Sequence, residues 1–151
     1  MPDSPEPWVI VVTSSRSVLF PPEVYSSNVS ARREVDRWLD ALGELLGLGT
    51  PIARNGTWTH AGIVIRLRQV SLAGPDANWL ATSWRGAAPN LAAFDDRSGA
   101  TRWVDSMTKS QRNMRRVQGS LSETWFAHSG EVMAAVIATK RCLVAPPVTT
   151  V

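Results

Sequence analysis

Hydrophobic and polar residues follow one another along this chain in a pattern of strands and helices that occurs twice. Residues 8 to 12 are continuously apolar and mostly β-branched, which predicts a strand covered on both faces. A second strand at 17–25 is interrupted by Pro21 and Pro22, which suit an edge or a bulge. Apolar residues at helical spacing then predict an amphipathic helix from 31 to about 46.

The stretch after this helix predicts a hairpin. Asn55 and Gly56 favour the positive φ angles that a tight two-residue turn between strands requires. We expect the outgoing strand to be long, from 57 to about 70, with Gly62 marking a bend or bulge within it.

The second half repeats this plan. Its pattern predicts strands at 79–85 and 90–94, a helix at 100–116 and a strand at 121–128. The stretch from Ser129 to Ala138 has the local pattern of a capped, alanine-rich helix. The equivalent stretch after His60 has the pattern of a strand, so the repeat favours a strand at 132–144.

Matching residues support a repeat. Thr-Ser-Ser-Arg at 13–16 returns 69 positions later as Thr-Ser-Trp-Arg at 82–85, and Thr-Trp-Thr-His at 57–60 is echoed by the Trp and His of 124–130. Further pairs at the offset of 69 are Tyr25 and Phe94, Ala31 and Ala100, Arg33 and Arg102, Val35 and Val104, and Asp36 and Asp105. We therefore predict an α+β fold with internally duplicated β-β-α-β-β units, which form antiparallel sheet or sheets with the two helices packed on one side.

Length and composition place these units in one compact domain. The chain has 151 residues, and half of that length would bury little apolar surface alone. We expect a disordered lead at 1–7, a single domain at 8–145 made of repeats 8–70 and 79–145 joined by 71–78, and a loose tail at 146–151.

The acidic, proline-rich start is unlike a signal peptide, and no apolar run reaches the length of a membrane helix. We expect a cytoplasmic protein of a bacterium or phage that does not engage a membrane.

Parts of the chain resemble known nucleic-acid-binding modules. The element order β-β-β-β-α in the middle is similar to that of the repeats in single-strand-binding Whirly and Pur-type proteins. The opening hairpin and helix, with Val-Tyr-Ser-Ser at 24–27 before Ala31, resembles the small module at the front of some ribonucleases H. These resemblances include no diagnostic motif, and they assign no family.

Basic residues and tryptophans form the first group of candidate binding residues. On a helix at 100–116, Arg102, Lys109, Arg112 and Arg116 would share one cationic stripe. These residues, together with Arg66 and Arg68, would contact the phosphate backbone of a single-stranded nucleic acid. The bases of that nucleic acid would stack on Trp58, Trp84 and Trp125. A solvated helix face is the alternative interpretation.

Residues matched between the halves form the second group. Arg16 and Arg85 each close a Thr-Ser-x-Arg strand end, where a guanidinium beside hydroxyls suits phosphate or carboxylate. His60 and His128 lie in similar Trp–His–Gly settings, but no acid at a recognisable spacing makes either a general base or a metal ligand. A structural role is the alternative for both pairs.

The sequence contains none of the common catalytic or phosphate-binding motifs, so we predict a non-enzymatic protein with no cofactor and no metal. We expect a small macromolecule-binding protein with a regulatory, inhibitory or accessory role of the phage or immunity type, acting by protein contact. The alternatives are a single-stranded nucleic-acid-binding protein and a phage virion or assembly component, which would form a homo-oligomer.

Overall fold

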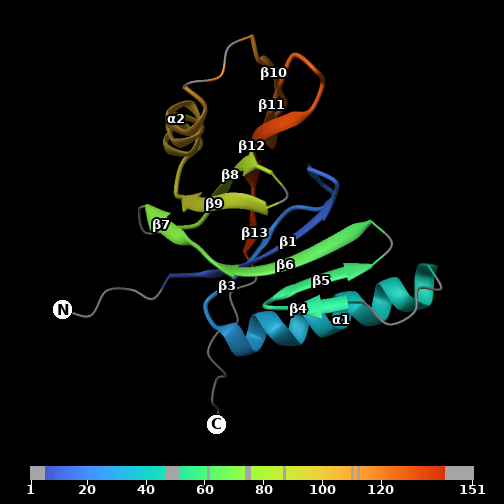
Figure 1. Cartoon of the computed structure of the whole chain (residues 1–151). Coiled ribbons are helices and arrows are strands. Elements are labelled where there is room, and N and C mark those ends of the chain that lie inside the picture. The colour runs from blue at the N-terminus through green and yellow to red at the C-terminus, as the bar shows by residue number, and fades with distance from the viewer. Residues whose placement is uncertain are drawn as a thin grey trace. The chain divides into compact units, whose positions relative to one another are not determined.

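The chain divides into two compact units in the computed structural model, which describes residues 6–46, 52–60, 62–73, 76–86, 88–109, 111 and 113–141. Unit 1 consists of Met1–Gln69 and Arg141–Val151, and unit 2 of Val70–Lys140. Each unit contains one helix and one sheet, which confirms the α+β class (Figure 1). Each helix packs against the sheet of its own unit, so the structure has two helices and two sheets, one of each in either unit.

Unit 1 is an antiparallel sheet with a helix on one face. Its elements are β1 (Trp8–Ser14), β2 (Ser17–Val18), β3 (Glu23–Tyr25), α1 (Asn28–Leu46), β4 (Ile52–Arg54), β5 (Thr57–His60) and β6 (Ile63–Gln69). The strands lie in the order β13-β3-β1-β6-β5-β4, where β13 is Lys140–Arg141, and β2 pairs with the end of β1.

The core of unit 1 follows from strand alternation and helical spacing. Ile10 and Ile65 point from the sheet toward α1, where Ala31 and Val35 are fully buried. The helix begins at a serine cap, because the Ser30 backbone N–H donates to the Ser27 hydroxyl at 3.2 Å. The predicted helix at 31–46 is thus confirmed and begins one turn earlier.

The predicted hairpin at Asn55 and Gly56 is confirmed, with φ angles of 48° and 74°. The predicted long strand at 57–70 is wrong. The chain reverses at Gly62, whose φ is 85°, and β5 and β6 pair as antiparallel neighbours. A glycine at positive φ inside an apolar run therefore marks a second turn here rather than a bulge.

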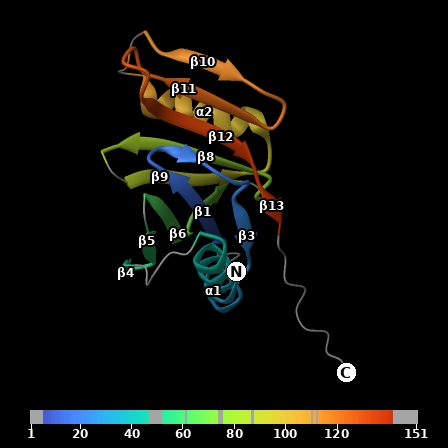
Figure 2. The same ribbon diagram turned by 90° about the vertical axis from the view of Figure 1, so that its right-hand side faces the viewer.

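Unit 2 has a six-stranded mixed sheet with its own helix. Its elements are β7 (Ser71–Ala73), β8 (Trp79–Arg85), β9 (Ala88–Phe94), α2 (Arg97–Thr108), β10 (Arg115–Gln118), β11 (Ser122–Phe126) and β12 (Val132–Ala138). The strand order is β10-β11-β12-β8-β9-β7, and only the short β7 pairs in parallel. Helix α2 packs behind β11 and β12 in the view of Figure 2, over a core that includes Val104, Trp125 and Val136.

The second helix is shorter than predicted. It is capped by Asp96, whose carboxylate accepts from the Gly99 N–H at 2.7 Å, and it ends at Thr108 instead of 116. Residues 115–118 form β10, which pairs with β11 over four positions. Backbone pairing with β11 outweighs a local pattern that fits a helix.

Residues 132–138 decide between the helix that their local pattern predicts and the strand that the repeat predicts. Residues 132–138 form β12 between β11 and β8, so the strand predicted from the repeat is confirmed there. Positions 142–144 of that prediction, the tail at 146–151 and the lead at 1–5 lie outside the described residues. Neither helix in the described part of the chain has the length and apolar character needed to cross a membrane.

The Thr-Ser-x-Arg motifs do not occupy equivalent positions. Trp8 lies opposite Tyr25, and Trp79 lies opposite Phe94, so the first residues of β1 and β8 correspond. Counted from these tryptophans, the motif begins five residues into β1 but three residues into β8, and its arginine lies in the turn after β1 but within β8. When β1 and β8 are aligned on their first residues, the two motifs therefore lie two residues apart, which is one repeat of the strand pleat.

Candidate functional site

The structure does not form the predicted cationic stripe. Arg102 lies exposed on α2 and Lys109 lies exposed at its C-cap, but Arg116 lies on β10, in a different element. Arg112 lies outside the described residues. The prediction fails because α2 ends before the last two members of the stripe.

Arg66 and Arg68 serve the fold of unit 1. Arg66 is 8% exposed and donates to the Thr13 hydroxyl at 3.0 Å, and burial, together with nearby Arg68, lowers its pKa below the usual value. Burial also lowers the pKa of Arg68, which donates to the Gly56 carbonyl at 2.7 Å and to the Thr57 hydroxyl at 2.6 Å. These bonds fasten the Asn55–Gly56 turn to β6.

The tryptophans predicted to face a partner are core residues. Trp84 is 2% exposed and Trp125 is 4% exposed, so neither offers a ring face to solvent. Trp58 is half-buried against the core under α1, and the Arg32 guanidinium lies 5.8 Å from its ring centroid. The prediction of exposed stacking residues is wrong for Trp84 and Trp125, because the large apolar ring area of each is used for packing.

The matched polar residues lie in different units and do not form one site within either. Arg16 is in the turn after β1, and Arg85 is the exposed last residue of β8. His60 ends β5, and His128 is exposed in the β11–β12 turn. Among the residues described, no group of three or more His, Cys, Asp or Glu side chains could hold a metal ion.

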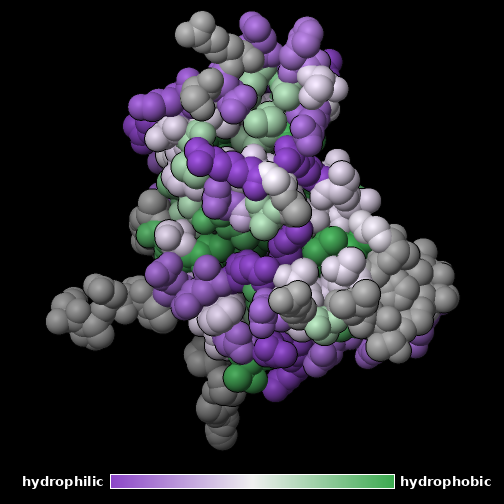
Figure 3. All heavy atoms as spheres, viewed as in Figure 1, coloured by the Kyte–Doolittle hydropathy of each residue, from purple (hydrophilic) through white to green (hydrophobic). Residues whose placement is uncertain are grey.

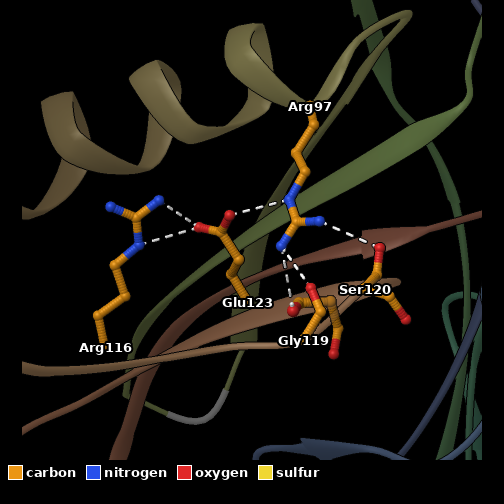
Figure 4. Close-up of polar contacts among 6 residues, drawn as sticks. Arg97, Arg116, Gly119, Ser120 and Glu123 are labelled. Carbon is orange, nitrogen blue, oxygen red and sulfur yellow. Dashed lines mark hydrogen bonds and ion pairs between the residues drawn. The ribbon is translucent and has the colours of Figure 1, made fainter.

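A buried carboxylate with two arginine partners lies in unit 2 (Figure 4). The Glu123 side chain on β11 is 6% exposed. Arg97, the first residue of α2, donates from Nε to Glu123 Oε1 at 2.8 Å, and Arg116 on β10 donates from Nε to Oε2 at 3.0 Å. Two cations on one buried carboxylate offset the cost of removing its charge from water.

The same arginines hold the β10–β11 turn and cover aromatic rings. Arg97 also donates to the Gly119 carbonyl at 2.6 Å and to the Ser120 carbonyl at 3.0 Å. Its guanidinium lies 5.2 Å from the Trp79 ring centroid, and that of Arg116 lies 5.1 Å from the Trp125 ring centroid. This network, which we call the Glu123 cluster, joins the start of α2, β10, the turn and β11.

The Glu123 cluster fixes the position of an exposed edge strand. All four residues of β10 are exposed, and no described strand pairs with its outer side. Arg115 stacks over Phe126, with its guanidinium 5.0 Å from the ring centroid, while Val117 and Leu121 are 49% and 67% exposed. In Figure 3 hydrophilic side chains, with small hydrophobic areas between them, cover the end of unit 2 that carries β10 and β11.

Sequence reasoning did not identify this edge strand. It assigned positions 112 and 116 to a helix, because cationic residues four apart fit a helical face. The residue that argues against a helix reaching Arg115 is Asn113, which has a left-handed φ of 63° between the end of α2 and the start of β10. Asparagine is the residue type, after glycine, that most readily adopts this conformation.

No protein-family model matches the chain, and comparison with curated proteins and with solved structures gives no match.

Proposed function

We propose that this chain is a non-enzymatic protein that acts by contact with another protein, in a regulatory or inhibitory role, and that β10 is its contact surface. The observation that carries the proposal is an edge strand that is exposed along its whole length yet held in place by a buried ion-pair network. An exposed edge offers backbone N–H and C=O groups to an added strand. A rigid edge loses little entropy when that strand binds.

The side chains of β10 favour an acidic partner segment. Arg115 makes no ion pair with the residues described, and its contact with Phe126 leaves the cation in solvent. Arg97 and Arg116 share one carboxylate, so the Glu123 cluster retains one excess positive charge. Val117 and Leu121 add exposed apolar contacts. An extended segment that alternates acidic and apolar residues matches the positive charge of this edge. Its period of two residues also matches the alternation of side chains along a strand.

Single-stranded nucleic acid is a second candidate partner, supported by the same positive charge. Backbone contacts by Arg115 would supply affinity. The buried positions of Trp84 and Trp125 remove two of the stacking platforms that such binding normally uses. For this reason the proposal favours protein.

A charge reversal at β10 tests the proposal. The full chain is titrated with a synthetic peptide of alternating valine and glutamate, with its lysine counterpart, and with a single-stranded oligonucleotide, while backbone amides are followed by NMR. The glutamate peptide is expected to shift amides of 115–118, and Arg115→Glu is expected to weaken its binding about tenfold or more by removing an attraction and adding a repulsion.

Arg102→Glu is the matched control, because it makes the same charge change at an exposed position on α2 of the same unit. Equal weakening by both variants, or equal binding of the lysine peptide, contradicts a specific edge contact. Binding of the oligonucleotide alone supports the nucleic-acid candidate instead. Light scattering of the free chain at high concentration shows whether a second copy occupies the edge.

We also propose that the two units descend from one ancestral β-β-α-β-β-β unit. The strand order β3-β1-β6-β5-β4 in unit 1 parallels β9-β8-β12-β11-β10 in unit 2, element for element. Ala31 and Val35 on α1 and Ala100 and Val104 on α2 occupy matching core positions. An experimental structure whose two units fail to superpose over these elements would contradict common descent.

A further inference from the structure

Unit 2 contains a pocket of about 370 Å³ where β8 and α2 both end. Ser83 and Arg85 reach it from β8, Thr108 from the last turn of α2, and Gln111 from the segment that follows the helix. A volume of this size falls within the range of small-molecule sites. The pocket lies at the end of α2 opposite to Arg97 and the Glu123 cluster.

Two polar side chains at this pocket lack partners. Ser83 is 3% exposed, and its hydroxyl makes no hydrogen bond with the described part of the chain. The exposed guanidinium of Arg85 likewise makes no ion pair or hydrogen bond there. The Ser83 hydroxyl lines the pocket, where water or a ligand can supply its partner. Both groups can donate hydrogen bonds into the same space.

The remaining lining defines the charge and character of a ligand. The Thr108 hydroxyl donates to the Val104 carbonyl at 2.8 Å, so the free donors at the pocket are Ser83, Arg85 and the Gln111 amide. Trp84, Met107 and Met133 complete the lining, and no acidic residue belongs to it. Methionine side chains adapt to varied apolar shapes. Three donors, one of them cationic, therefore provide most of the accessible lining, and the apolar side chains provide less of it.

We propose that this pocket binds a small carboxylate. A guanidinium and a hydroxyl match the acceptor oxygens of a carboxylate, and Met107 and Met133 leave room for a short apolar part only. One unpaired arginine suits a single negative charge. The carboxylate can belong to a free organic acid or to the C-terminus of a peptide, and both present the same chemistry.

The test is NMR of the ¹⁵N-labelled full chain with propionate and its neutral amide, propionamide. A short peptide ending in alanine, with a free or an amidated C-terminus, forms the second arm. Saturable shifts of the Trp84 indole N–H and the Gln111 side-chain amide are expected with the carboxylates and not with the amides. Binding of the acid identifies a free ligand, and binding of the free-ended peptide alone identifies a protein tail.

Four variants locate the interaction. Arg85→Gln is expected to weaken carboxylate binding about tenfold or more, and Ser83→Ala several-fold. Arg102→Gln, an exposed cation outside the pocket lining, is expected to leave affinity unchanged, as is Arg115→Glu on β10. The proposal is overturned if the amides bind as tightly as the acids, if Arg102→Gln acts like Arg85→Gln, or if neither arm produces shifts up to about 10 mM. Because β10 does not line the pocket, these results are independent of the edge-strand proposal.

Discussion

Replacing Glu123 with glutamine is expected to lower the free energy of unfolding by about 3 kcal/mol, because it leaves two guanidinium groups beside a site that no longer carries negative charge. Glu123 is 6% exposed, whereas Arg97 and Arg116 are 30% and 39% exposed. Their partial hydration places the expected loss at the lower end of what breaking a buried ion pair costs. Urea unfolding followed by circular dichroism measures the change.

Two companion variants separate this cluster from general charge effects. Asp105→Asn removes an exposed carboxylate of α2 and is expected to change stability by less than about 0.5 kcal/mol. Arg116→Met is expected to cost about 1 kcal/mol, because Arg97 still pairs with Glu123. If Glu123→Gln unfolds at the same urea concentration as the unchanged chain, the ion pairs do not stabilise unit 2.

Truncating Trp125 to alanine is expected to destabilise the chain by about 4 kcal/mol. The ring is 4% exposed in the core of unit 2, next to Val104 and Val136, and it also supports the Arg116 guanidinium. Its removal opens a cavity under α2 that the surrounding side chains fill only in part. Thermal and urea unfolding both report the loss.

Leu121→Ala is the matched control, since Leu121 is 67% exposed in the β10–β11 turn and is expected to change stability by less than about 0.5 kcal/mol. Trp125→Phe keeps most of the apolar volume and is expected to cost about half as much as alanine. A stable Trp125→Ala variant that only loses partner binding would instead assign the ring to a contact surface.

Strong local signals predicted much of the fold. Asn55 and Gly56 specify their turn because few other residue pairs adopt positive φ at both positions. Both helices were predicted, but their starts at 31 and 100 were placed one turn too late, because the caps at Ser27 and Asp96 start them at Asn28 and Arg97. Strand 132–138 was predicted from the repeat alone, since its alanines carry a local preference for helix.

The failures share a different cause, which is that backbone pairing between strands overrides the local residue pattern. The reversal at Gly62 and the strand at Arg115–Gln118 both depend on pairing with the next strand in the chain, which the residue pattern of either segment alone does not show. The Glu123 cluster joins residues 97, 116 and 123, and no motif spacing marks such a set. Burial of Trp84 and Trp125 likewise reflects packing in three dimensions, whereas composition shows only that tryptophans are abundant.

The central place of β12 sets the order in which unit 2 can fold. It forms a local hairpin with β11, but its pairing with β8 joins Trp79 to Ala138, positions separated by 59 residues (138 − 79). Closing so long a loop costs entropy before the paired strands return any stabilisation. Until β12 inserts, the β8–β9 pair and the β10–β11 pair remain separate. The alanine-rich segment that forms β12 also has a local preference for helix, which competes with its insertion into the sheet. Docking of this strand is therefore the step that slows folding and completes the sheet.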